Sequence, residues 1–128
     1  MRTRSIKSLR LQAWKLQSEL IRREEGGVCY TCGKIQNWKD CHCGHFKHLD
    51  SLDFYRPNLH CQCCGCNTYR HGNLANYAEH LVRDYGKSIL QEILTLGHQI
   101  KKFTSTELEQ IIDDRKKKII ALDNRKEI

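Results

Sequence analysis

The sequence lacks long apolar segments. No run approaches the roughly 20 apolar residues that a membrane-spanning helix needs, so we expect no membrane partner. Met1–Lys7 also lacks the apolar region of a signal peptide, and we therefore expect a cytoplasmic protein. Repeats and low-complexity segments are absent. The single proline, Pro57, argues against a central strand at that position.

The chain is also too short for a large core. Its 128 residues have room for one domain, or for a small core with helical arms. Such a core is marginally stable, so a segment rich in polar residues and turns needs additional stabilisation by disulfides or a bound metal. All eight cysteines lie between Val28 and Asn73. Four disulfides would suit a secreted protein, but cysteine pairs in a reducing cytoplasm more often bind metal.

The charge balance favours an anionic partner. The chain has 22 Lys and Arg residues against 15 Asp and Glu residues, a formal net charge of +7. Basic proteins of this kind commonly bind a polyanion such as nucleic acid. Charge alone is equally consistent with a soluble basic protein that binds none, so the site chemistry has to decide.

Apolar residues recur at helical spacing in four segments. Gly26–Gly27 ends the first, as glycines just past a helix commonly do. Thr104–Glu107 has the pattern of a capping box and starts the last. The predicted helices cover residues 4–25, residue 67 or 73 to 85, residues 88–96 and residues 104–126. Between the first two, we expect short strands at 38–46 and 59–62, separated by a loop at 49–58.

Two Cys-x-x-Cys pairs about thirty residues apart are a strong zinc signal. The first pair is Cys29 and Cys32, where Gly33 relieves the tight turn of a knuckle. The spacing leaves the second pair open between two choices: Cys61 with Cys64, or Cys63 with Cys66. Four thiolates would hold a closed structural zinc that does no chemistry.

Phosphodiester hydrolysis needs a base, a hard cation and convergence of both on one phosphate. His45 is the candidate base, because Gly44 before it would let a backbone or a phosphate come close. The alternative for His45 is a structural or zinc-bound histidine. Asn67 follows the last cysteine, and His71 lies four residues on, so we expect both on one helical face where they could grip a cation. The alternatives are a helix N-cap for Asn67 and a plain surface histidine for His71.

These motifs occur together in one known family. The matching residues are Cys29-x-x-Cys32-Gly33, Trp38-Lys39-Asp40, Gly44-His45-Phe46, Phe54, Asn58, Gln62-Cys63-x-x-Cys66-Asn67, Gly72-Asn73, Tyr77 and Tyr85-Gly86. In these residues the chain resembles the NinG/Rap recombination proteins of lambdoid phages, a branch of the HNH (His-Me finger) endonucleases. It is similar, more distantly, to phage recombination endonuclease VII. The resemblance covers most of the chain.

The resemblance implies a role for several residues. It implies a ββα-metal fold around residues 36–80, with His45 as the general base. It selects Cys63 and Cys66 as the second zinc pair. It implies that Asn67 binds magnesium, with His71 as a further ligand. Asn58 would brace the strand that carries the base.

The chain departs from the family pattern at two places. Gly44 stands where many HNH proteins have Asp or His, so the metal ligand on the first strand is open between His42 and Asp40. Four cysteines lie outside the pattern, and a second zinc site made from them stays open: Cys41, Cys43, Cys61 and Cys64.

Together these observations predict a small α+β protein with a zinc-stapled HNH core at residues 28–86. An N-terminal basic helix at 1–27 and a C-terminal helical arm at 87–128 would flank it. The expected function is a magnesium-dependent endonuclease of phage recombination that cuts branched DNA, with manganese as an alternative metal.

The expected partners are branched or duplex DNA and a second copy of the chain, with no small-molecule substrate. Residues expected to hold flanking phosphates are Lys47, Arg56 and Arg70. Two other functions stay open: a non-catalytic zinc-finger module that binds nucleic acid, and a nonspecific HNH nicking enzyme.

Overall fold

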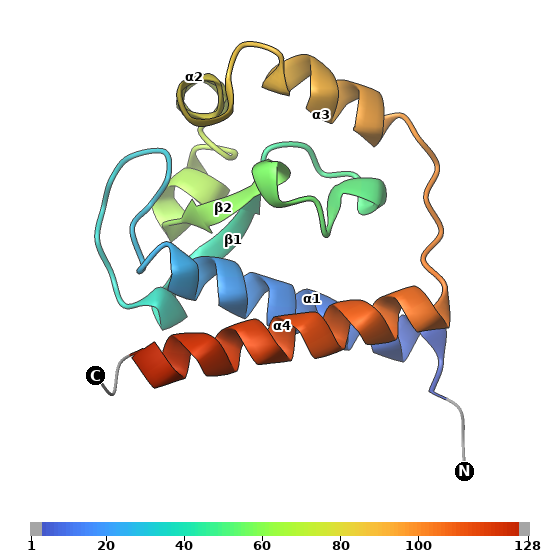
Figure 1. Ribbon diagram of the computed structural model, residues 1–128. Helices are drawn as coiled ribbons and strands as arrows, with labels where there is room; N and C mark the ends of the chain where they lie inside the picture. Colours follow the sequence, from blue (N-terminus) through green and yellow to red (C-terminus); the bar gives the residue numbers. More distant parts are fainter. Residues whose placement is uncertain (1–3, 126–128) are drawn as a thin grey trace.

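A computed structural model describes residues 4–125 and shows three layers (Figure 1). A two-stranded hairpin lies in the middle, one pair of helices covers its lower side, and the other pair lies above it. The elements are α1 (Ile6–Glu24), β1 (His42–His45), β2 (Leu59–Gln62), α2 (Leu74–Tyr85), α3 (Ile89–Gly97) and α4 (Ser105–Arg125). The predicted α+β class is confirmed.

The hairpin divides its side chains between the two helical layers. β1 and β2 are antiparallel, with His42 opposite Gln62 and His45 opposite Leu59. Because side chains alternate along a strand, positions three apart project from opposite faces. His45 therefore faces α1, whereas His42 faces the cysteine knuckle, the two turns that carry Cys29–Cys32 and Cys63–Cys66. This register decides which of the candidate site residues can meet.

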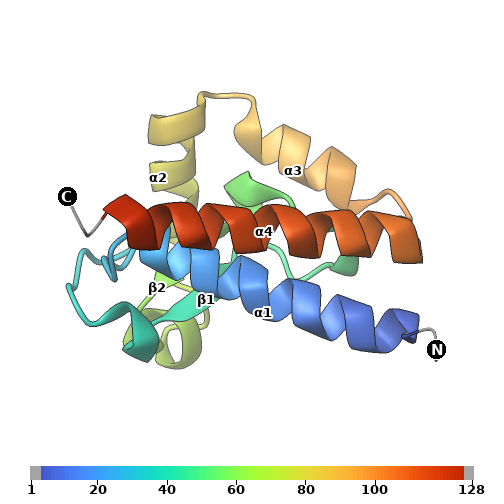
Figure 2. The same ribbon diagram turned by 60° about the horizontal axis from the view of Figure 1, so that its bottom comes forward.

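The lower layer consists of α1 and α4, which run side by side in the same direction (Figure 2). Leu9 and Ala13 of α1 pack against Leu108 and Ile112 of α4 in one buried cluster. The apolar stripes of the two predicted arms are therefore used largely on each other. The remaining buried face of α1 lies against the hairpin.

The upper layer joins α2 and α3 through a core of Leu52, Tyr77, Leu81, Ile89 and Ile93. The Tyr77 ring is fully buried, and its hydroxyl donates a hydrogen bond of 2.8 Å to the carbonyl oxygen of Gly44 on β1. A buried phenol needs such a partner, so this bond fixes α2 against the middle of the hairpin.

The helix ends follow the predicted signals. Gly26 and Gly27 have φ angles of +63° and +73° and lead the chain out of α1. Before α4, the backbone N–H of Glu107 donates to the Thr104 hydroxyl, and the backbone N–H of Thr104 donates to the Glu107 carboxylate, both at 3.1 Å. These reciprocal bonds confirm the capping box.

One predicted boundary was wrong, and at another the structure selects one of the two predicted alternatives. The predicted first strand at 38–46 is divided, because Trp38–Asp40 forms a 3-10 turn and only His42–His45 is strand. The chain after the second cysteine pair does not enter a long helix. Gly65–Tyr69 is a single π-helical turn, and α2 starts at Leu74 with Asn73 as its N-cap. The predicted helix start at residue 73 is therefore confirmed, and the alternative start at residue 67 is excluded.

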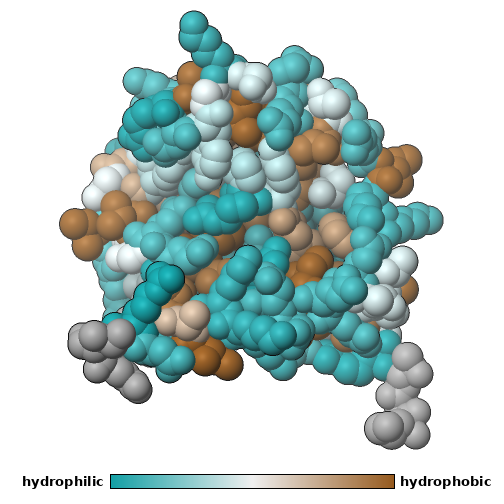
Figure 3. Space-filling model, viewed as in Figure 1, coloured by the Kyte–Doolittle hydropathy of each residue, from teal (hydrophilic) through white to brown (hydrophobic). Residues whose placement is uncertain are grey.

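The surface visible in Figure 3 is mostly hydrophilic, with apolar residues in small separate patches. Among residues 4–125, no helix combines the length and the apolar character that crossing a bilayer requires.

Gly44 has a packing role that tests the fold. A Cβ at this position would lie 1.8 Å from Gln62 Oε1 and 2.6 Å from Gln62 Cδ. Gln62 is fully buried and its amide nitrogen donates to Thr31 and to the Gly72 carbonyl, so it cannot move aside freely. We expect Gly44→Ala to lower the free energy of unfolding by about 1–3 kcal/mol, as measured by urea denaturation.

Gly65→Ala is the matched control, because its Cβ would meet only Cys63 Sγ at 3.8 Å, an ordinary contact. We expect this variant to stay within about 0.5 kcal/mol of the wild type. Equal losses in the two variants would show that Gly44 is not required by the Gln62 packing.

Candidate metal centre and histidine pocket

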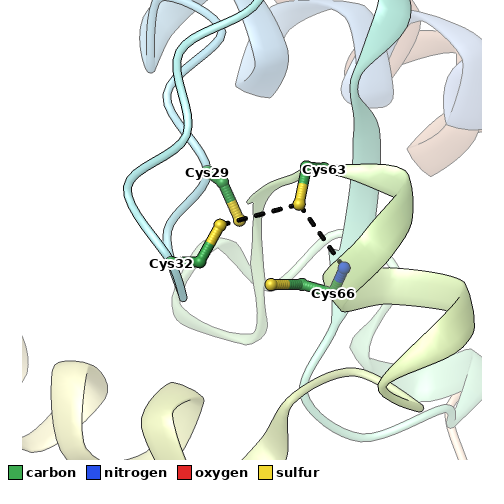
Figure 4. A group of neighbouring side chains, drawn as sticks. All are labelled: Cys29, Cys32, Cys63 and Cys66. Carbon is green, nitrogen blue, oxygen red and sulfur yellow. Dashed lines mark hydrogen bonds between the residues drawn. The ribbon is translucent and has the colours of Figure 1, made fainter.

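Four cysteine side chains from two separate segments point toward one another (Figure 4). Cys29 and Cys32 come from the loop after α1, and Cys63 and Cys66 follow β2. The sulfur atoms all lie within 4.8 Å of one another, and the Cys32 and Cys63 sulfurs are 3.7 Å apart. Tetrahedral zinc with bonds of about 2.3 Å requires sulfur separations of about 3.8 Å. This donor set and its spacing fit a closed zinc site.

The surroundings of the cluster supply N–H and O–H groups to the sulfurs. The backbone N–H of Cys66 points at Cys63 Sγ at 3.4 Å, and the side-chain amide of Asn73 donates to Cys66 Sγ at 3.5 Å. Burial raises the pKa of the Cys29 thiol, but hydrogen bonds from the Thr31 hydroxyl and from backbone amides outweigh it and lower that pKa to about 6. Burial raises the pKa of the Cys63 thiol and raises that of Cys32 to about 12. Zinc binds thiolates, so a bound cation would have to stabilise the charged form of these two.

The other four cysteines do not form a second cluster. Within residues 4–125, the four-cysteine group is the only set of three or more metal-type side chains that converge. Cys41 and Cys61 are buried near the hairpin, and burial raises the pKa of Cys43 to about 12. Cys64 is exposed beside Thr68. The described part of the chain therefore offers one zinc position.

His45 lies in a surface pocket between α1 and the loop after β1. Its ring stacks on Trp14 of α1 with the centroids 4.9 Å apart, and its Nε2 lies 3.2 Å from Asp53 Oδ1. His48, Leu49 and Asp50 complete the lining. The His45 side chain is 17% exposed, so water can reach this pocket while the indole holds the ring in place.

Asp53 orients the His45 ring and is itself held by Arg10. The second oxygen of Asp53 accepts a bond of 2.9 Å from the Arg10 guanidinium. Burial raises the pKa of the Asp53 carboxyl, but the bonds from His45 and Arg10 outweigh it, so the pKa lies below its ordinary value. An ionised Asp53 accepts the proton on Nε2, which leaves Nδ1 as the unprotonated nitrogen of a neutral ring.

Asn67 contacts a different histidine. Its side-chain nitrogen lies 2.9 Å from Nδ1 of His42, on the knuckle side of the hairpin. His45 leaves the opposite face, so the structure does not bring His45 and Asn67 to one point. The prediction that the two converge was wrong. The three-residue spacing of His42 and His45 on one strand was a signal that only one of the two histidines could face Asn67.

The remaining residues predicted to hold magnesium do not join them. His71 is exposed with a φ of +51°, two residues beyond the π-helical turn, so it does not share a helical face with Asn67. Asp40 is exposed in the 3-10 turn before β1. The described residues therefore give magnesium, which prefers several oxygen ligands, no matching donor set.

Asn58 fixes the chain just beyond His45. Its side chain is fully buried and bonds both backbone groups of Lys47 at 2.9 Å. The backbone oxygen of Asn58 also accepts from the N–H of Phe46 at 2.9 Å. These bonds hold the end of β1, and with it the direction of the His45 side chain.

The three predicted phosphate contacts have different environments. Lys47 is half-buried with its ammonium over the Phe46 ring, and Arg70 is exposed beside the cysteine cluster. Arg56 is used inside the protein, because its guanidinium pairs with Glu25 at 2.8 Å and donates to the Leu59 carbonyl at 2.6 Å. Its predicted role at DNA is not supported by these contacts.

Three residues around His45 were not predicted from the sequence: Trp14 and Asp53, which line the pocket, and Arg10, which bonds Asp53. Trp14 and Arg10 were interpreted only as parts of an amphipathic helix, and Asp53 lay in an unassigned loop. Their proximity to His45 depends on how α1 packs against the hairpin, which no local pattern shows.

Comparison with known proteins gives a consistent family match. A family model described as "Bacteriophage Lambda NinG protein" matches residues 1–127. The chain is 28% identical to Protein ninG of Escherichia phage lambda over 116 residues, covering 88% of this chain and 56% of that protein. It is also 28% identical to Protein ninG of Salmonella phage P22 over 120 residues, covering 91% of this chain and 59% of that protein.

The chain thus spans somewhat more than half the length of these relatives. No solved structure matches it significantly.

The cysteine cluster generates a test of zinc stoichiometry. We expect the purified protein to contain one zinc per chain, measured by elemental analysis. Cys63→Ser should lose the zinc and most of the cooperative thermal unfolding, because binding at such a site contributes directly to folding. Cys64→Ser is the control: it has the same chemistry one residue away and should keep both. Two zincs per chain, or equal losses in both variants, would contradict a single site at these four thiols.

The half-buried Glu25 carboxylate allows a test by pH. It accepts from His60 at 2.6 Å, from Arg56 and from the backbone N–H of Cys61. Burial raises its pKa, but these partners outweigh it, so the pKa lies below 4.5. A lowered carboxyl pKa contributes stability above the unfolded value, which is lost as the pH falls through the folded value. We expect Glu25→Gln to cost about 1.5–3 kcal/mol near neutral pH.

This cost should shrink as the pH falls through the lowered pKa of the folded protein, where the wild-type Glu25 carboxyl also becomes protonated. Urea denaturation of both proteins across the acid range measures the difference, and the zinc content of each sample is determined at every pH. Glu109→Gln on the exposed side of α4 is the control and should show no pH-dependent difference. A constant cost at all pH values would mean that the negative charge of Glu25 does not stabilise its contacts with His60 and Arg56.

Proposed function

Because the chain belongs to the Bacteriophage Lambda NinG protein family, we propose that it is a structure-selective DNA endonuclease of phage recombination with an HNH-like core. The proposed substrates are branched DNA molecules such as Holliday junctions and D-loops. The observation that carries the proposal is the hydrogen-bonded pair of His45 and Asp53 in a pocket open to the surface. A histidine oriented by a carboxylate is a common arrangement for activating water.

The pair supports a direct sequence of proton and bond changes. Neutral His45 removes a proton from water through Nδ1, and the resulting hydroxide attacks the phosphorus of the scissile phosphodiester. The bond to the leaving oxygen breaks, and that oxygen takes up a proton from the solvent. Asp53 stabilises the imidazolium that forms, and Arg10 keeps Asp53 ionised. Trp14 holds the ring so that little reorganisation is needed.

Positive charge supports DNA as the partner. The net charge of +7 attracts a phosphate backbone, and exposed Arg70 and half-buried Lys47 are available for contacts. Binding should therefore weaken steeply as salt is added.

The two metals have different standing in this proposal. Zinc on the four cysteines would hold the knuckle and the hairpin together. Magnesium or manganese would supply charge stabilisation at the phosphate, but the residues predicted to bind it are not assembled, and we assign no ligand to it.

One observation favours a second function, a non-catalytic module that binds nucleic acid. His45 and Asn67 lie on opposite faces of the hairpin, which separates the base from the residue expected at the cation. In such a module the zinc and the basic residues would matter, while His45 would not.

A homodimer is part of the favoured proposal, since symmetric resolution of a junction takes two cuts. The dimer contact would have to use a surface other than the stripes of α1 and α4, which cover each other. A monomer by light scattering, both free and on DNA, would oppose this part of the proposal.

The test of the catalytic proposal is cleavage of a synthetic four-way junction with magnesium, with manganese and with neither. We expect His45→Ala to reduce the cleavage rate by at least about 100-fold, the usual contribution of a general base. Asp53→Asn should cause a smaller loss, because it disturbs the orientation of the ring and leaves the base in place.

His98→Ala is the matched control, because His98 is an exposed histidine at the end of α3. It should cut as the wild type does, and zinc content should be unchanged in all three variants. Cleavage by His45→Ala at the wild-type rate would remove His45 from the mechanism. Junction binding without cleavage by any protein would support the binding module instead, and equal cutting of linear duplex would support the nonspecific nicking enzyme.

A further inference from the structure

A second pocket lies away from His45, where the C-terminal ends of α1 and α4 meet the turn that contains Trp38. Its volume is about 590 Å³, which falls in the range of roughly 300–1,000 Å³ typical of small-ligand sites. The lining residues are Arg23, Gly26, Gln36, Asn37, Trp38, Lys39, Leu122 and Arg125.

The lining is strongly positive around one aromatic ring. It contains Arg23, Lys39 and Arg125 and, among the described residues, no carboxylate. The guanidinium carbons of Arg22 and Arg23 each lie 5.3 Å from the centre of the Trp38 ring, and the Lys39 ammonium lies 5.8 Å from it. Arg23 is paired with carboxylates, but Lys39 and Arg125 form no ion pair within the described part of the chain, so an anion in the pocket would meet unpaired positive charge.

Arg23, which lines this pocket, also carries a buried donor without a partner among the described residues. Its side chain is only 10% exposed, and it pairs with Glu19 at 3.1 Å and with Asp123. Its Nε is nevertheless buried and has no hydrogen-bond partner within the described part of the chain. A buried donor without a partner is uncommon in folded proteins. Because this Nε is buried, a ligand in the pocket would reach the exposed Lys39 and Arg125 instead.

We propose that this pocket binds one unpaired nucleotide of a DNA strand. The phosphate would contact Lys39 and Arg125, and the base would pack against Trp38. Nucleobases pack well on aromatic rings while cations hold the neighbouring phosphates. This inference rests on DNA as the partner in the proposed function and deepens it. A base in a continuous duplex is stacked and cannot enter the pocket, whereas bases at a branch point can leave the stack.

The two tryptophans of the chain allow a direct binding measurement. Trp14→Phe leaves Trp38 as the single indole, and its fluorescence is followed during titration with a short oligothymidylate. We expect saturable quenching. Lys39→Ala in the same background should weaken binding by about tenfold, in keeping with the contribution of one base and its phosphate. Lys87→Ala, an exposed lysine between α2 and α3, is the control and should bind as the parent does.

Two further ligands test the base contact. A strand of the same length without bases should quench Trp38 much less, and a blunt duplex should do the same. Equal quenching by the strand without bases would overturn the proposal, as would an unchanged affinity in Lys39→Ala. Zinc content and circular dichroism of each variant show that the fold is retained.

These outcomes are separate from those of the cleavage assay. Junction cleavage without any Trp38 response would remove the nucleotide pocket and leave the endonuclease proposal standing. A Trp38 response without junction cleavage would support the nucleotide pocket and remove the endonuclease proposal.

Discussion

The arrangement of the loop after α1, the end of β2 and the start of α2 depends on the meeting of four sulfur atoms. Cys29 and Cys32 belong to the loop that leaves α1, and Cys63 and Cys66 directly follow β2. Joining these segments fixes the hairpin between the knuckle and α1. With only a small buried core in each layer, the chain has little else to hold that geometry. A metal ion at this point would therefore be a structural requirement for both pockets.

The polar side chains of the candidate sites lie on two opposite faces of the hairpin. On one face, His45 meets Trp14 and Asp53; on the other, His42 meets Asn67. Such a division follows from strand alternation alone and does not depend on side-chain detail. It means that the base and the amide expected to cooperate are held by different layers. Any account of catalysis here has to start from the His45 face, where a histidine, carboxylates and open space occur together.

Local patterns predicted much of the fold but less of the site. Helical periodicity located α1, α3 and α4, the capping box at Thr104 marked a helix start, and residues 59–62 form the predicted second strand. These features depend on neighbours in the sequence. The partner of His45 could not be predicted, because Asp53 meets it only after α1 has packed against the hairpin. The gap beside Gly44 was interpreted as room for a phosphate, but Gln62 fills it from the other strand.

The parallel pairing of α1 and α4 has a consequence for how the chain is made. Leu9 and Ala13 lie against Leu108 and Ile112, about a hundred positions later in the sequence. A ribosome releases α1 long before α4 exists, so the apolar stripe of α1 stays uncovered during most of translation. Contacts between such distant segments also form slowly, because a long loop must close first. The nascent chain is therefore exposed to aggregation or chaperone capture in the interval before α4 emerges.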